Sequence, residues 1–527
     1  MTKGKTDKTT IDTSHTGKLP RFLEAIWQDS RIGWAIAIGT AILFGVIVAM
    51  IMPRGPTTAT LALFGMSGGL AIGLIAGLAT RSRWAMILAP VAHMITMEIT
   101  WLGVQGVTVD AIRLDNMYGI LALIFGRGFY ALMVLLPMIL GASLGAEFAR
   151  RLSGRATPAE SKLKTIARWT PTAIIAFVLI ALAVLVVLPP STPPILGTDG
   201  KPLPGSIAEL QTVKLNGDDQ AILIRGHSVD NPVLLYLSGG PGQSDMAFTR
   251  VLYTDLEKDF VVVSWDQRGN GKSYSALDPV SEFTFNQSVS DTIELTNYLR
   301  ERFGEDKVYL LGESYGSLLG VQAVKQRPDL YYAYIGSGQM VSPKETDRRL
   351  WQDMQDYANR TGNEQLGATM RAYGQPPYQD IFGYMTVMSY YDALAGPYTP
   401  PAEYMQKGQG ANIGPYGVFA SEYSFVERVN VVRGLFDVFS LMYPQLQEID
   451  YRQDVPRLEV PVYILDAEHE LASRRNLSTE WCNQLEAPHK EMIIFQNAGH
   501  SVAFEEEYNL SRIMNESIVP RTYPGKK

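Results

Sequence analysis

Cysteine and histidine are scarce in this chain. A single cysteine, Cys482, and six histidines occur in 527 residues. One cysteine excludes an intramolecular disulfide framework and every metal site that needs several cysteine ligands. Basic clusters are missing from the part of the chain that reads as soluble, and the net charge is −7. Nucleic acid is therefore not an expected partner.

Charged and apolar residues are divided unevenly along the chain. Residues 1–190 hold 17 Lys and Arg against 9 Asp and Glu, whereas the rest of the chain holds 29 against 44. A bilayer core of about 30 Å needs about 20 apolar residues of helix. Such runs occur near residues 33–52, 58–79, 84–104, 118–146 and 171–188. They predict an all-α membrane bundle of about five helices over 33–188, after a cytoplasmic leader at 1–32.

The second apolar run carries a glycine repeat. Gly65, Gly69, Gly73 and Gly77 recur every four residues. Glycines at this spacing share one face of a helix and allow a neighbouring helix to approach closely. The repeat therefore predicts helix packing rather than chemistry.

The connections between the runs predict an orientation. Cytoplasmic loops carry more Lys and Arg than loops on the other side. The leader and the second and fourth connections are basic, whereas the first and third hold only Arg54 and Arg113. We therefore expect a multi-pass protein of the cell membrane with a cytoplasmic N-terminus. Five crossings place everything after residue 188 outside the cytoplasm.

The remainder of the chain has the pattern of an α/β domain. A proline-rich stretch near 189–194 predicts an extended linker over 189–204. Beyond it, short β-branched and aromatic runs alternate with helix-length segments, at 233–237, 261–265, 308–311, 331–335, 462–465 and 492–495. Unbroken apolar strands separated by helices predict a mostly parallel sheet covered on both faces.

A candidate nucleophile follows the third of these runs. The sequence GESYGS at 312–317 contains G-x-S-x-G and leads into a helical stretch. A tight turn between strand and helix exposes the serine hydroxyl, and the flanking glycines allow close backbone approach. Ser314 is therefore the predicted nucleophile.

Two further motifs fit the same chemistry. The loop SGGPG at 238–242 follows a strand directly, and a glycine-rich loop there is able to aim an N–H at an oxyanion. Pro241 has no N–H, so we expect the donors to be Gly240 and Tyr315, the residue after the nucleophile. His500 lies in a loop after the last strand, where the general base is expected.

Together these motifs resemble a known family. SGGPG (238–242), DQRGNGKS (266–273), GESYGS (312–317) and AGH (498–500) look like the prolyl iminopeptidase-like branch of the α/β-hydrolase superfamily, over roughly residues 206–510. The resemblance implies a Ser-acid-His triad, no metal or other cofactor, and a helical cap. The expected hydrolase core covers 205–339 and 455–527, and the cap covers 340–454.

At the position where the family has its triad aspartate, this chain has a glutamate, Glu470. We expect Glu470 to orient His500, with Asp466 as the alternative acid and Glu468 as a weaker one. A glutamate serves if the loop retreats by the length of one methylene. Glu313 stands where iminopeptidases of this branch usually have glycine.

The expected function is that of a membrane-anchored serine hydrolase. It cleaves an ester or amide through an acyl-enzyme, and an aminopeptidase acting on short peptides is one interpretation. An esterase or lipase acting on acyl substrates near the bilayer, and a catalytically silent binding module, are the alternatives. Cap carboxylates such as Glu422 or Glu427 are candidate partners for a substrate ammonium. The sequence leaves the substrate and the oligomeric state open.

Overall fold

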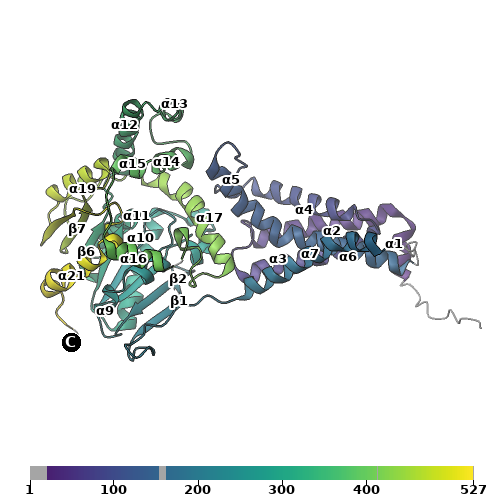
Figure 1. Ribbon diagram of the computed structural model, residues 1–527, viewed down its shortest axis with the longest axis horizontal. Coiled ribbons are helices and arrows are strands. Elements are labelled where there is room, and N and C mark those ends of the chain that lie inside the picture. The colour runs from purple at the N-terminus through teal and green to yellow at the C-terminus, as the bar shows by residue number, and fades with distance from the viewer. Residues whose placement is uncertain (1–20, 154–161, 412, 526–527) are drawn as a thin grey trace, which may run out of the picture. The chain divides into compact units, whose positions relative to one another are not determined.

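The computed structural model describes residues 21–153, 162–411 and 413–525, in two compact units (Figure 1). Unit 1 comprises Met1–Pro53, Leu63–Thr100 and Ala131–Ala181. Unit 2 comprises Arg54–Ala62, Trp101–Tyr130 and Leu182–Lys527. Most of the expected leader, residues 1–20, lies outside the described residues.

Helices account for the regular structure of unit 1. Those that lie wholly or mostly in it are α1 (Arg21–Gln28), α2 (Ser30–Ile51), α3 (Ala59–Thr80), α4 (Ala85–Trp101), α6 (Leu136–Leu152) and α7 (Lys162–Val187), with a π-helical stretch at Ala131–Leu135. Among the described residues, four segments are long and apolar enough to cross a membrane, namely Ser30–Ile51, Ala59–Thr80, Met117–Leu152 and Trp169–Val187. The third expected run forms α4, a shorter apolar helix of 17 residues.

The glycine repeat of α3 packs directly against α6. A Cβ added at Gly73 would lie 2.0 Å from the carbonyl oxygen of Met138, and one at Gly141 would lie 2.1 Å from that of Leu70. Gly77 and Gly145 show the same close approach, and Gly69 approaches the carbonyl oxygen of Val134, just before α6, in the same way. The two helices therefore meet backbone to backbone, which agrees with the packing role predicted from the four-residue spacing.

This interface gives a direct test. Gly73→Ala places a methyl group where the backbone of α6 already lies, and overpacking of this kind costs about 1–3 kcal/mol. We expect a lower melting temperature for the full chain in detergent. The matched control is Gly39→Ala in α2, because a Cβ there meets nothing within 4 Å. Equal melting temperatures for the two variants would contradict the close packing.

The sheet of unit 2 has eight strands in the order β1-β2-β4-β3-β5-β6-β7-β8. The strands are β1 (Ile207–Leu215), β2 (Asp218–Gly226), β3 (Val233–Leu237), β4 (Val261–Asp266), β5 (Val308–Glu313), β6 (Tyr331–Ser337), β7 (Val462–Ala467) and β8 (Lys490–Phe495). β2 pairs antiparallel with β1 and with β4, and the other pairs are parallel. The predicted α/β class is confirmed, and each of the six predicted runs forms a strand.

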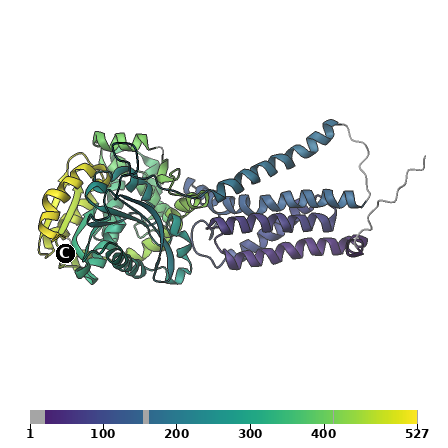
Figure 2. The same cartoon turned by 90° about the horizontal axis from the view of Figure 1, so that it is seen from below.

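Helices cover both faces of this sheet (Figures 1 and 2). Leu235 and Leu310 belong to one buried apolar cluster, whereas Leu234 and Leu311 belong to another, as the alternation of side chains along a strand requires. The first cluster includes residues of α10 (Phe285–Phe303), α11 (Tyr315–Gln326) and α19 (Ala472–Gln484). The second includes residues of α8 (Met246–Leu252), α9 (Leu256–Asp259), α20 (Val502–Glu505) and α21 (Glu507–Ile513). A short helix, α22 (Val519–Thr522), follows near the C-terminus.

Between β6 and β7 the chain is helical. The helices are α12 (Pro343–Thr361), α13 (Glu364–Tyr373), α14 (Ile381–Met388), α15 (Tyr391–Ala395), α16 (Ala402–Gly410), α17 (Phe425–Met442) and α18 (Tyr451–Asp454). α17 begins at a capping box formed by Ser424 and Glu427. We refer to α12–α18 as the cap.

Two segments that precede the linker in the chain belong to the same compact unit as the sheet. They include α5 (Met117–Leu123) and pack against α17 of the cap. The backbone N–H and hydroxyl of Thr108 donate to Asp437 at 2.8 and 2.6 Å, and Arg433 donates to the carbonyl oxygen of Pro56 at 2.9 Å. Asp437 and Arg433 are fully buried, so these contacts supply partners that water does not.

Candidate active site

Ser314 lies in a strained turn between β5 and α11. Its φ of +50° is a left-handed value that a non-glycine residue rarely adopts. A Cβ at Gly316 would lie 2.2 Å from the carbonyl oxygen of Leu237, and one at Gly312 would lie 2.5 Å from that of Gly316. The glycines therefore allow the tight turn predicted for G-x-S-x-G. Ser314 itself is 7% exposed and lines a cavity.

His500 and Glu470 come together from the loops after β8 and β7. Nδ1 of His500 lies 2.5 Å from Oε2 of Glu470. The other carboxylate oxygen accepts the N–H of Leu471 at 2.7 Å and the hydroxyl of Tyr391. Burial alone would raise the pKa of Glu470, but His500, Arg474 and Tyr391 outweigh it and lower that pKa to about 2. The carboxylate is therefore charged at neutral pH and holds Nδ1–H.

Asp466, the alternative acid, has other partners. It accepts the hydroxyl of Ser478 at 2.6 Å and the N–H of Ala467 at 2.8 Å. Burial raises the pKa of Asp466 to about 6. Glu468 is exposed. Of the acids considered from the sequence, the structure brings Glu470 to the imidazole and leaves Asp466 in the strand.

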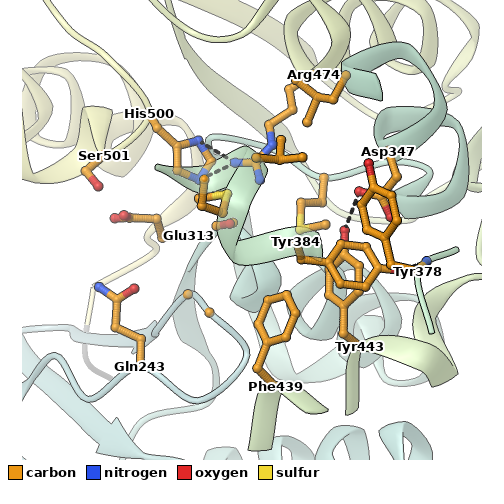
Figure 3. A pocket seen from close by; sticks show the side chains of 17 residues that line it. Gln243, Glu313, Asp347, Tyr378, Tyr384, Phe439, Tyr443, Arg474, His500 and Ser501 are labelled. Atoms are coloured by element: carbon orange, nitrogen blue, oxygen red, sulfur yellow. Dashed lines mark hydrogen bonds between the residues drawn. The ribbon is translucent and has the colours of Figure 1, made fainter. Parts of the chain in front are cut away.

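Ser314 and His500 line the same cavity, whose volume is 120 Å³. Within the described residues the two side chains are not hydrogen-bonded. Nη1 of Arg474 instead lies 2.7 Å from Nε2 and 3.1 Å from Nδ1 of His500 (Figure 3). Arg474 was not expected at the site, because its only sequence signal is its position four residues after Glu470.

The glycine-rich loop after β3 borders the hydroxyl. A Cβ at Gly239 would lie 3.3 Å from Cβ of Ser314, and Gly239 and Gly240 both line the cavity. The N–H of Gly239 is bonded to the carboxylate of Asp245. Gly240 adopts a φ of +108°, which glycine tolerates. The N–H of Tyr315 belongs to the first turn of α11, where no earlier carbonyl of the helix accepts it.

Two buried carboxyl groups face the same cavity, Glu313 and Asp347 (Figure 3). Burial, with Asp245 nearby, raises the pKa of Glu313 to about 8. Burial also raises the pKa of Asp347 to about 7, although this group accepts the hydroxyl of Tyr443 at 2.8 Å. Both groups are thus poised to become charged beside a cationic ligand.

The cap carboxylates suggested from the sequence lie elsewhere. Glu422 pairs with Arg250 at 2.6 Å, and Glu427 pairs with Lys272 at 2.8 Å. Neither glutamate is among the residues that line the cavity. They pair with residues outside the cap instead of facing Ser314.

Aromatic side chains form the wall of the cavity opposite His500. Tyr378, Tyr384, Phe439 and Tyr443 line both this cavity and a second one of 330 Å³. Neighbouring rings are 4.6–5.8 Å apart between centroids. The rings therefore form a thin partition between two hollows of unit 2.

The model of the alpha/beta hydrolase fold family matches residues 232–507, more than half of the chain. The chain belongs to this family. It is 30% identical over 301 residues to a probable aminopeptidase, YbaC, of Bacillus subtilis, and the match covers 57% of this chain and 93% of that protein. In the described part of residues 1–188, four apolar helices long enough to cross a membrane precede the hydrolase fold.

Other similar proteins are iminopeptidases by name. A proline iminopeptidase of Thermoplasma volcanium is 32% identical over 163 residues, which cover 29% of this chain and 50% of that protein. The crystal structure of a proline iminopeptidase-related protein from Thermus thermophilus covers 60% of this chain and 99% of its own, at 19% identity and a TM-score of 0.42. The resemblance stated from the four motifs is confirmed.

The two candidate acids give opposite expectations on mutation. Glu470→Gln removes the charge that holds Nδ1–H and stabilises the imidazolium, so kcat should fall roughly 10³- to 10⁴-fold. Asp466→Asn removes a charge that touches Ser478, and most of the activity should remain. Steady-state kinetics on any cleaved ester measures both. The reverse pattern would assign the acid to Asp466.

Proposed function

We propose that this protein is a membrane-anchored serine hydrolase with Ser314 as nucleophile, His500 as base and Glu470 as the orienting acid. The observation that carries the proposal is the 2.5 Å contact between Glu470 and His500 beside a cavity that Ser314 also lines. Nδ1 is then the protonated ring nitrogen, and Nε2 is the atom that accepts the proton of the serine.

The catalytic cycle follows from these roles. The proton of Ser314 passes to Nε2 as Oγ attacks the carbonyl carbon, and the N–H groups of Gly240 and Tyr315 bind the oxyanion. His500 then gives the proton to the leaving group. Water, activated by the same imidazole, hydrolyses the acyl-enzyme.

The proposed substrate is a short peptide with a free N-terminus. Two relatives are named as an aminopeptidase and a proline iminopeptidase. Glu313 and Asp347 support this choice, because both buried carboxyl groups face the cavity. Among the described residues that line it, Arg474 is the only permanently charged cation. An ammonium group would supply a second one, and an acyl chain would not.

Covalent labelling and a blocked substrate test this function. A fluorophosphonate probe should label the protein and should fail to label Ser314→Ala. N-acetylation of a cleaved peptide should lower kcat/KM by about 100-fold or more, since it removes the ammonium. Labelling that persists in Ser314→Ala would exclude the proposed nucleophile. Equal cleavage of blocked and free peptides would exclude a requirement for the ammonium, cleavage of esters but not of peptides would point to an esterase, and absence of labelling to a silent binding module.

The pH dependence of binding should report on Asp347. Its raised pKa means that the carboxyl is mostly neutral below about pH 7 and charged above it. KM for a peptide with a free ammonium should therefore fall as the pH rises from about 6 to about 8, and Asp347→Asn should weaken this trend. Identical profiles for the two proteins would exclude Asp347 as a partner of the ammonium.

We also propose that the hydrolase lies outside the cytoplasm, as the basic connections predict. The chain's only cysteine is buried, so introduced cysteines are easily followed. An impermeant maleimide should label Lys201→Cys in intact cells, because Lys201 is exposed in unit 2. Arg151→Cys, whose native side chain is 70% exposed near the end of α6, should react only after lysis. The opposite result would invert the topology.

A further inference from the structure

Arg474 is a buried cation in the catalytic cavity that the catalytic cycle does not use. It lies in the first turn of α19 and is 9% exposed. Its guanidinium reaches between His500 and the group formed by Asp347 and the tyrosines of the partition (Figure 3). The side chain thus occupies the space where a substrate would meet the base.

The guanidinium lies against the ring of the base. Because Glu470 holds Nδ1–H at 2.5 Å, the acceptor of the neutral imidazole is Nε2. Nη1 of Arg474 lies 2.7 Å from Nε2 and 3.1 Å from Nδ1, so it sits over the ring and not in line with the lone pair of Nε2. An arginine stays protonated at physiological pH, and a cation this close disfavours the imidazolium that forms when His500 takes the proton of Ser314.

The guanidinium of Arg474 also keeps an unfilled donor. Among the described residues, the structure records no ion pair between this guanidinium and a carboxylate, and its Nε has no hydrogen-bond partner. Burial opposes the charge, but Tyr391, Glu470, Tyr443 and Asp347 outweigh it and raise the pKa of Arg474. The cation is therefore stable in the cavity, and an oxyanion from a ligand would supply the direct partner that its Nε lacks.

We propose that Arg474 binds a carboxylate on the leaving group of the substrate and thereby selects dipeptides. This inference rests on the proposed function. Nε2 of His500 is the atom that protonates the leaving group, so a group lying against Nε2 is placed next to that half of the substrate. In a dipeptide the leaving group is a free amino acid, whose carboxylate is close to the scissile bond. The planar guanidinium pairs with a carboxylate through two parallel hydrogen bonds.

The same contact couples binding to chemistry. When the carboxylate pairs with the guanidinium, it offsets the positive charge beside the ring, and Nε2 accepts the proton of Ser314 more readily as the Oγ–C bond forms. The C–N bond then breaks as that proton passes to the leaving nitrogen. A substrate without the carboxylate leaves Arg474 on the base, so it reacts slowly even when it fits the cavity.

Matched pairs of substrates test this role in the full-length protein. L-alanyl-L-alanine is compared with L-alanyl-L-alaninamide, and the butyryl ester of 4-hydroxybenzoate is compared with that of 4-hydroxybenzamide. Each pair differs in the charge of the leaving group. We expect kcat/KM to favour the carboxylate by at least about tenfold in both pairs, as charge-assisted hydrogen bonds allow.

Variants locate the preference. Arg474→Gln should reduce both ratios to near one, and Arg474→Lys should retain part of the preference because it keeps the charge. The matched control is Arg475→Gln, because the neighbouring arginine donates to the carbonyl oxygen of Glu468 and does not line the cavity. Its ratios should equal those of the unmodified protein.

The outcomes separate the two proposals. Ratios near one in the unmodified protein, or ratios unchanged by Arg474→Gln, overturn the role of Arg474. A carboxylate preference on the esters without cleavage of either dipeptide overturns the aminopeptidase function and the selection of dipeptides, and leaves standing the binding of the leaving-group carboxylate by Arg474. Cleavage of none of the four compounds overturns both.

Discussion

The contact between His500 and Glu470 is the interaction on which the rest of the site depends. It joins the loops that follow β7 and β8, and the turn that carries Ser314 follows β5 at the same edge of the sheet. Parallel strands bring the carboxyl ends of distant segments together, which is why residues 470 and 500 meet beside the cavity that residue 314 also lines. The carboxylate fixes which ring nitrogen carries the proton. With the proton on Nδ1, Nε2 is the ring atom that is able to accept a proton.

Most of the sheet was predictable because its central strands are buried on both faces. Their sequences are continuous apolar runs, and these stand out from the helices between them. The hairpin of β1 and β2 was not predicted. β1 mixes buried, half-buried and exposed positions and lacks such a run. The residues proposed as nucleophile, base and acid followed from motifs whose order along the chain is tied to the fold.

The cap resisted prediction for a physical reason. Its apolar and charged residues serve helix packing as well as the cavity, and a sequence does not say which helix face meets the sheet. Glu422 and Glu427 therefore looked like ligand-binding groups but pair with Arg250 and Lys272. Arg474 is the opposite case, because its sequence context predicts a surface residue and the structure places it in the cavity. A basic residue one helical turn after an acidic one is typical of an ordinary surface pair, and only the fold shows it turned inward.

The segments that pack against α17 have a consequence for how the protein is made. Thr108 and Pro56 are synthesised long before Asp437 and Arg433, the residues that they hydrogen-bond. The hydrolase unit is therefore discontinuous in the chain. It is complete only when α17, which is synthesised late, packs against the segments Arg54–Ala62 and Trp101–Tyr130, which are synthesised early. A shortened chain that starts at the linker would bury an aspartate and an arginine without these partners. The stretches that connect the N-terminal helices consequently form part of the interior of the hydrolase unit.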